Sequence, residues 1–254
     1  LIIMEIKKTK ASTLKFLKLK SAFIPKLISF EEKKFIKNKD NILDFISKNF
    51  KKKIAIRSSH YKEDQKKNSY AGYFKSFLNI NKNAKTDIEV KIKEVFKSYL
   101  KAGPANKRNE VIIQNMVSNA LLSGVVTSCD KDNFTPYYVV NFTKSNDTSK
   151  ITSGALNGST FVYYKRSKSK PSNKYLIKII NLVDELCRLF GPALDIEFAF
   201  DKKGAIYLLQ VRDIIKNKNY SNVNLNFSTP FNKLTKKIKK LKSRHYNLFG
   251  KTNL

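Results

Sequence analysis

The alternation of apolar and polar positions predicts helices and strands along the first hundred residues. Apolar residues recur at helical spacing from Ala11 to Leu19, from Glu31 to Asn49 and from Ile88 to Leu100, so each stretch is predicted to be an amphipathic helix. The run from Lys53 to Ser58 has the pattern of a short buried strand. Alternation from Gly72 to Ile80 predicts a second strand.

A different pattern begins at Val111, where short β-rich runs are separated by polar or glycine-containing loops: residues 111–117, 124–127, 137–142 and 160–165. A helix follows over 173–190, then two strands, 194–200 and 205–214, around the turn 201–204. This is the pattern of a mixed α/β protein. We therefore expect an N-terminal lobe (residues 1–107), a C-terminal lobe (residues 108–215) and a basic tail (residues 216–254).

The last two predicted strands carry the candidate chemistry. If Phe200 pairs with Ala205, Asp195 lies opposite Gln210 and Glu197 opposite Leu208, because side chains alternate along strands. One face is then apolar, with Ile196, Phe198, Phe200, Tyr207, Leu209 and Val211. The other carries Asp195, Glu197, Gln210 and Arg212 beside Ala199, Ile206 and Leu208. Partly buried carboxylates need a cation such as Mg²⁺ with nucleotide phosphates; a solvated face with an Asp–Arg pair is the open alternative.

The formal net charge of +31 leaves two explanations open. A basic surface attracts nucleic acid, anionic lipid or phosphorylated ligands. The lysines are nevertheless spread over the whole chain together with many Asn and Ile residues, as the codons of an AT-rich genome would give. No apolar run approaches the roughly 20 residues of a membrane helix. Cys129 and Cys187 show no disulfide or zinc spacing, so we expect a cytoplasmic protein without a membrane partner.

Four segments, in order, resemble the nucleotide-binding domain of the phosphoenolpyruvate synthase and pyruvate phosphate dikinase family. They are T-K-A-S-T-L at 9–14, similar to a G-K-G-x-N-L turn with its glycines replaced; R-S-S, E-D and S-Y-A-G at 57–59, 63–64 and 69–72; Q-N-M-V and S-G-V at 114–117 and 123–125; and D-I-E and L-L-Q-V-R at 195–197 and 208–212. The resemblance covers roughly residues 8–214. It implies an α/β (α+β) class, two-lobed ATP-grasp fold with mixed or antiparallel sheets and flanking helices.

The same resemblance implies roles for individual residues. Lys10 and Arg57 would hold the ATP phosphates, although Lys10 could equally be one more surface lysine. The loop residues Ser69, Ala71 and Gly72 would lie over the phosphates, and the backbone of Gln114, Met116 and Val117 would read the adenine edge, unless it is an ordinary core strand. Glu197 and Gln210 would ligate Mg²⁺, and Arg212, with Arg57 and Asp195, would act in phosphoryl transfer.

The resembled family passes the phosphoryl group to a histidine on a separate domain. The histidines of this chain, His60 and His245, do not lie in a G-G-x-x-S-H setting, so the phosphocarrier histidine is expected on a further domain, and the chain looks like a fragment with weak activity alone. Residues 137–154 also resemble L-glutamine kinases of bacterial capsules, which would make glutamine the acceptor. A phosphoenolpyruvate synthase-like fragment, a non-catalytic ATP binder and a basic nucleic-acid-binding module remain alternatives, although no nucleic-acid-binding motif is present.

Overall fold

A computed structural model describes residues 9–61, 73–102, 109–131, 134–143, 158–167, 169, 171–214 and 235–237. The chain divides into two units, Leu1–Lys216 and Asn217–Leu254. In the second unit the described residues, 235–237, are helical, and the rest of the basic helix expected over 233–242 lies outside the described residues. Within the described residues, no helix is both long enough and apolar enough to span a membrane.

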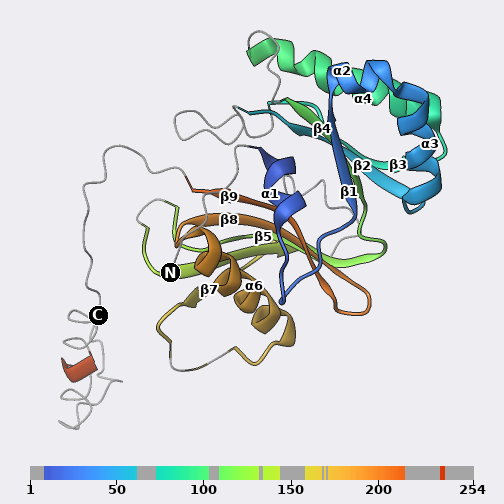
Figure 1. Ribbon diagram of the computed structural model, residues 1–254. Coiled ribbons are helices and arrows are strands. Elements are labelled where there is room, and N and C mark those ends of the chain that lie inside the picture. Colours follow the sequence, from blue (N-terminus) through green and yellow to red (C-terminus); the bar gives the residue numbers. More distant parts are fainter. Residues whose placement is uncertain are drawn as a thin grey trace, which may run out of the picture. The chain divides into compact units, whose positions relative to one another are not determined.

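The first sheet has the strand order β1-β4-β2-β3, and its neighbouring strands are antiparallel (Figure 1). The strands are β1 (Leu27–Glu31), β2 (Lys53–Ser59), β3 (Phe77–Asn81) and β4 (Glu110–Asn115). The accompanying helices are α2 (Glu32–Lys37), α3 (Lys39–Asn49), α4 (Lys85–Tyr99) and the 3₁₀ turn η1 (Leu100–Ala102). The single helix expected over 31–49 is therefore two helices, which meet at Asn38.

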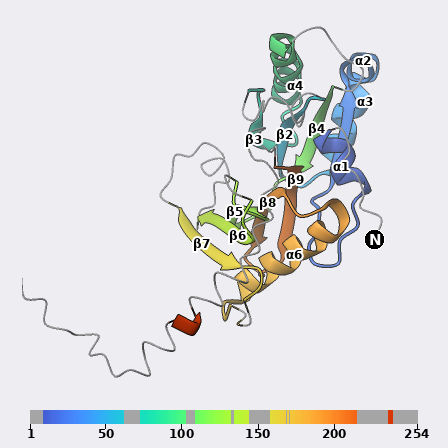
Figure 2. The same cartoon turned by 90° about the vertical axis from the view of Figure 1, so that its left-hand side faces the viewer.

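The second sheet has the order β7-β6-β5-β8-β9 and is also antiparallel throughout. Its strands are β5 (Ala120–Thr127), β6 (Tyr137–Thr143), β7 (Ser159–Tyr164), β8 (Leu194–Asp201) and β9 (Ile206–Asp213). The long helix α6 (Lys174–Phe190) lies along this sheet, and the short helix α1 (Lys10–Phe16) lies close to β9 (Figure 2). Mixed α/β class with antiparallel sheets and flanking helices is thus confirmed.

Each sheet buries one face in its own apolar core. On the first sheet, Ile54 and Ile56 of β2 pack with residues of α3 and α4, so the intervening Ala55 and Arg57 face away from these helices. On the second sheet, Ile196 and Phe198 of β8 pack against α6, so Asp195 and Glu197 face the other way. Alternation along two strands thereby places Arg57 and the two carboxylates outside the helix-covered cores.

Strand β4 belongs to the first sheet, although it follows the lobe boundary expected at residues 107/108; the division into two lobes at that boundary stays a prediction. It pairs with both β1 and β2, with Ile113 opposite Ile28 and Ile56. The change of composition near 103–110 marks the end of α4 and η1, whereas the passage from one sheet to the other comes between β4 and β5. A change of amino-acid composition shows where helices give way to strands. The sheet to which a strand belongs depends on which distant strands it pairs with.

The register of the β8–β9 hairpin also differs from the expected one. Phe200 pairs with Ile206, and Glu197 and Asp195 pair with Gln210 and Arg212. The turn is one residue longer than expected, which moves Ile206 and Leu208 to the apolar face, and a β-bulge at Leu209 then reverses the alternation of β9 again, so that Gln210 and Arg212 keep the face of the carboxylates. The expected placements of four residues are therefore wrong: Ile206 and Leu208 lie in the apolar core, whereas Tyr207 and Leu209 do not. The expected common face of Asp195, Glu197, Gln210 and Arg212 is confirmed.

Gly124 of β5 should not tolerate a side chain. A Cβ there would lie 2.3 Å from the carbonyl oxygen of Asn141 on β6 and 2.9 Å from Cζ of Phe198 on β8. We expect Gly124→Ala to lower the free energy of unfolding by about 1–3 kcal/mol, because the strands on both sides would have to move. Urea denaturation measures this. Ser123→Ala is the matched control: its hydroxyl is buried without a hydrogen-bond partner, so that variant should be neutral or stabilising. Equal losses would contradict the explanation.

Candidate functional site

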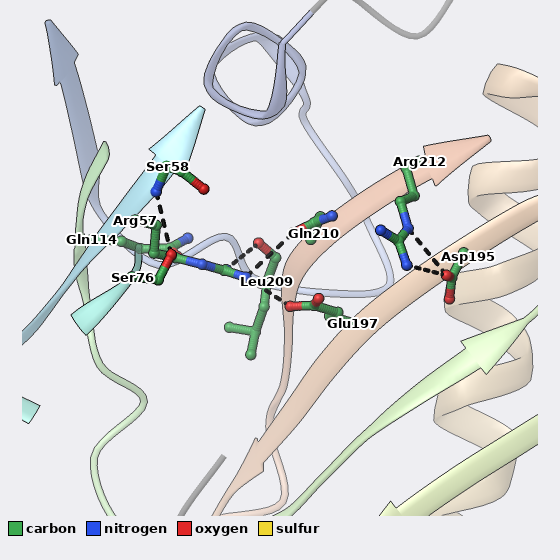
Figure 3. A network of polar contacts seen from close by, with 9 residues as sticks. All are labelled: Arg57, Ser58, Ser76, Gln114, Asp195, Glu197, Leu209, Gln210 and Arg212. Atoms are coloured by element: carbon green, nitrogen blue, oxygen red, sulfur yellow. Dashed lines mark hydrogen bonds and ion pairs between the residues drawn. The ribbon is translucent and has the colours of Figure 1, made fainter. Parts of the chain in front are cut away.

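Arg57 of β2 connects the two sheets. Its Nη2 donates to Oε2 of Glu197 at 2.8 Å and to Oε1 of Gln210 at 3.3 Å, both on the second sheet (Figure 3). Its Nη1 donates to the carbonyl oxygen of Leu209 at 3.2 Å and to Oε1 of Gln114 at 3.5 Å. Arg57 and Glu197, which were both assigned to the nucleotide site, are far apart in the sequence but form an ion pair in the structure.

The carbonyl oxygen that Arg57 contacts belongs to the bulged residue of β9. Leu209 has no directly opposed residue on β8, since Leu208 pairs with Phe198 and Gln210 with Glu197. Bulges are common beside functional sites, where they redirect backbone or side-chain groups. Here the bulge turns Gln210 and Arg212 to the face that carries the carboxylates, and it offers a backbone acceptor to Arg57.

Asp195 is the centre of a second charged network (Figure 3). Its Oδ2 accepts hydrogen bonds from Arg212, at 2.7 Å from Nη2 and 3.1 Å from Nε, and from Nζ of Lys131 at 3.2 Å. Oδ1 of Asp195 is buried and has no hydrogen-bond partner. Lys131 was not among the residues expected at the site. In a chain with 51 Lys and Arg residues, nothing in the sequence distinguishes it.

The charges of both networks act on Glu197. Burial by itself would raise the pKa of this carboxyl group, but the positive charges of Arg57, Lys10 and Arg212 outweigh burial and hold the pKa below its usual value. Lys10, at the start of α1, is therefore close enough to join the site electrostatically. The described residues bring together four cationic side chains and two carboxylates, with a formal net charge of +2: Lys10, Arg57, Lys131, Arg212, Asp195 and Glu197.

Gln114 lies at the end of β4, on the same face of the first sheet as Arg57. Its side chain is 2% exposed; Oε1 accepts from Arg57, but Nε2 has no hydrogen-bond partner. The next two residues, Met116 and Val117, begin the connection to β5 and are half-buried. The backbone N–H of Met116 donates to the carbonyl oxygen of Lys53 at 3.1 Å. That donor is engaged within the first sheet, so a contact of Met116 with adenine stays a prediction.

The expected phosphate loop lies outside the described residues, with Ser69, Ala71 and Gly72 among them. The residues before and after it are described. His60 is 2% exposed, and its ring packs against the rings of Tyr61, Phe74 and Tyr99 at 4.5–5.0 Å between centroids. The hydroxyl of Tyr99 accepts from the N–H of Ser59 and donates to the carbonyl oxygen of Glu110. This aromatic cluster holds the end of β2 in place beside Arg57.

The oxygen atoms of the site fit a magnesium ion that is bound together with phosphates. Among the described residues, no group of three or more His, Cys, Asp or Glu side chains is placed to hold a metal ion. Glu197 and Gln210, however, direct one oxygen each to the same nitrogen of Arg57, so both can serve one cation. Mg²⁺ commonly takes one or two protein oxygens and completes its shell with phosphates and water.

A family model described as the pyruvate phosphate dikinase AMP/ATP-binding domain matches residues 32–169, more than half of the 254-residue chain. The matched part contains Arg57 and Gln114, whereas Asp195, Glu197, Gln210 and Arg212 follow it. No curated protein sequence matches the chain.

Several solved structures are similar to the chain. The VanG D-Ala:D-Ser ligase from Enterococcus faecalis is 14% identical over 90% of this chain and 61% of its own, with a TM-score of 0.46. The D-alanine-D-alanine ligase from Helicobacter pylori is 16% identical over 80% of this chain and 51% of its own, with a TM-score of 0.39. A dinucleotide-forming acetyl-coenzyme A synthetase from Ca. Korarchaeum cryptofilum is 11% identical over 76% of this chain and 86% of its own, with a TM-score of 0.42. The chain thus spans only part of the length of the two ligases.

Proposed function

Since this chain belongs to the pyruvate phosphate dikinase AMP/ATP-binding domain family, we propose that it binds Mg·ATP between its two sheets and prepares a phosphoryl group for transfer. The observation that carries the proposal is that Arg57, a cation of the first sheet, contacts Glu197 and Gln210 of the second sheet. Phosphoryl-transfer sites work mainly by positioning and by stabilising charge. A formal net charge of +2 complements the charge of about −2 that Mg·ATP carries.

Each described residue of the site has a part in this proposal. Glu197 and Gln210 hold Mg²⁺, which neutralises phosphate charge when it is bound. Glu197 and Gln210 would hold the ion through the two oxygens that Arg57 contacts in this structure, and Arg57 would then donate to the phosphates, with Lys10 beside it. The buried Nε2 of Gln114 supplies a hydrogen-bond donor that has no other partner. Such an unsatisfied buried donor costs free energy unless a ligand oxygen accepts from it.

Arg212 is proposed to contact the phosphoryl group that is transferred. Asp195 accepts from both Nε and Nη2 of Arg212, and this arrangement fixes the plane of the guanidinium group before a ligand arrives. Preorganised donors stabilise developing charge without any cost of reorientation during the reaction. Asp195 is therefore a positioning residue for Arg212.

The acceptor is the finer part of the proposal. We propose that the phosphoryl group passes to a carrier histidine that lies outside this chain and finally to L-glutamine. The resemblance of residues 137–154 to glutamine kinases supports this acceptor, and burial of His60 among three aromatic rings supports a carrier elsewhere. In the phosphoenolpyruvate synthase-like alternative, the same Mg·ATP site serves a different acceptor.

Isothermal titration of the chain with Mg·ATP tests the nucleotide site. We expect saturable binding that requires Mg²⁺ and that raises the unfolding temperature as mass action predicts. Phosphorus NMR of the same samples, with glutamine added, looks for a new P–N bond, which the chain alone should not form. Absence of ATP binding would contradict the proposal. Salt-sensitive retention of RNA without ATP-dependent stabilisation would instead favour a nucleic-acid-binding module.

A further inference from the structure

Lys131 lies just beyond the end of β5, beside the charged end of β8. The last residue of β5, Thr127, pairs with Asp195, and four residues later Nζ of Lys131 donates to Oδ2 of the same Asp195 at 3.2 Å. Nη2 of Arg212 lies 2.7 Å from that oxygen. Two cations thus share one carboxylate oxygen, and the three side chains together carry a formal charge of +1.

The ion pair of Lys131 contributes little to folding. The side chain of Lys131 is 53% exposed, compared with 27% for Arg212 and 7% for Asp195. Such an exposed lysine pair stabilises a fold only weakly, because water screens the charges and the side chain loses entropy. Arg212 alone already balances the charge of Asp195. Lys131 is therefore not needed to balance the charge of Asp195, and as the most exposed member of the network it is the one that a ligand reaches first.

The other oxygen of Asp195 shows that this network is not a closed structural salt bridge. Oδ1 is buried and has no hydrogen-bond partner, although a buried carboxylate normally has both oxygens satisfied. Both cations are held on Oδ2, and the exposed side chain of Lys131 leaves its ammonium group accessible to a ligand. The excess of positive charge on Lys131 and Arg212 indicates a site for an anionic group, and Oδ1 of Asp195 is left as an acceptor for a hydrogen-bond donor or a cation.

We propose that Lys131 is a further phosphate-binding residue, which contacts the terminal phosphoryl group of ATP together with Arg212. This inference rests on the proposed function. Asp195 and Glu197 are two positions apart on β8, about 6.6 Å at the usual rise of a strand. The Arg57–Glu197 network and the Lys131–Asp195–Arg212 network are therefore spaced along β8 as successive parts of a polyphosphate would require. Lys131 belongs to the network of Arg212, at the end where the group is transferred.

The test compares Lys131→Met with Lys75→Met. Lys75 is 55% exposed and pairs with Glu94 at 2.6 Å, so both variants remove one exposed, ion-paired lysine and change the net charge equally. Isothermal titration with Mg²⁺ present measures the binding of ATP, tripolyphosphate and AMP. Lys131→Met should weaken ATP and tripolyphosphate binding by about tenfold or more, the usual size for one charged hydrogen bond, and leave AMP binding within about twofold. Lys75→Met should bind all three like the unchanged chain, and Lys131→Arg should restore most of the loss.

The outcomes separate this inference from the proposed function. If the unchanged chain binds none of the three ligands, the proposed function fails and the inference with it. If the unchanged chain binds ATP and Lys131→Met binds it equally well, only the inference fails. Equal weakening of ATP and AMP, together with a lower urea midpoint, would show that Lys131 acts through the fold and would also overturn the inference.

Discussion

An Arg212→Ala variant should transfer phosphoryl groups about three to five orders of magnitude more slowly, the range known for arginines that contact a migrating phosphoryl group. Its dissociation constant for Mg·ATP should change far less, because such a contact strengthens mainly in the transition state. Single-turnover ATP cleavage, measured on the polypeptide that carries this chain together with the histidine-bearing domain proposed above, gives the rate. Titration calorimetry gives the dissociation constant.

Two further variants control this experiment. Arg212→Lys keeps the charge but cannot donate to Asp195 from two nitrogens, so it should recover only part of the rate. Arg188→Ala removes an exposed arginine of α6, the helix that packs on the opposite face of the second sheet, and should leave both rate and affinity unchanged. If the Arg212→Ala variant lost affinity as strongly as rate, Arg212 would serve ground-state binding and its proposed role would be wrong.

Replacing Arg57 by Met should lower the free energy of unfolding by about 3–5 kcal/mol, the usual cost of leaving a buried charge without its partner. The side chain of Glu197 is only 19% exposed, and Gln210 and the carbonyl oxygen of Leu209 would lose the same donor. Urea denaturation measures the loss. The double variant Arg57→Met/Glu197→Gln should recover part of it, because the unpaired charge is gone. If the double variant lost as much free energy of unfolding as the two single variants together, the ion-pair explanation would be contradicted.

The same substitution should change how stability depends on pH. Burial raises the pKa of Glu197, but Arg57, Lys10 and Arg212 hold it below its usual value of 4.5. A carboxylate with a lowered pKa in the folded state stabilises the fold above its unfolded pKa, and this contribution is lost as the pH falls through the folded pKa. The unchanged chain should therefore lose stability below about pH 4.5. In Arg57→Met, carbon-13 NMR of the Glu197 carboxyl should give a higher pKa; an unchanged value would contradict this account.

Local patterns in the sequence were sufficient to predict most elements and the composition of the site. The β2 strand was expected over 53–58 and observed as Lys53–Ser59, and α6 was expected over 173–190 and observed as Lys174–Phe190. Asn173 caps α6 by accepting from the N–H groups of Tyr175 and Leu176, a signal that can be read from the sequence. The common face of the carboxylates with Gln210 and Arg212 was also expected, since alternation is a property of neighbouring residues.

The sequence by itself therefore determined which side chains are available for charge chemistry and which strands carry them. Tertiary structure decided the partners. The bulge at Leu209 forms because Ile206, Leu208 and Val211 all pack into the same core, which strict alternation does not allow. Membership of β4 in the first sheet depends on pairing with β1 and β2, and Lys131 reaches Asp195 only because β5 and β8 are neighbours. Such contacts depend on how distant segments pack, and one more lysine among many carries no local sign of them.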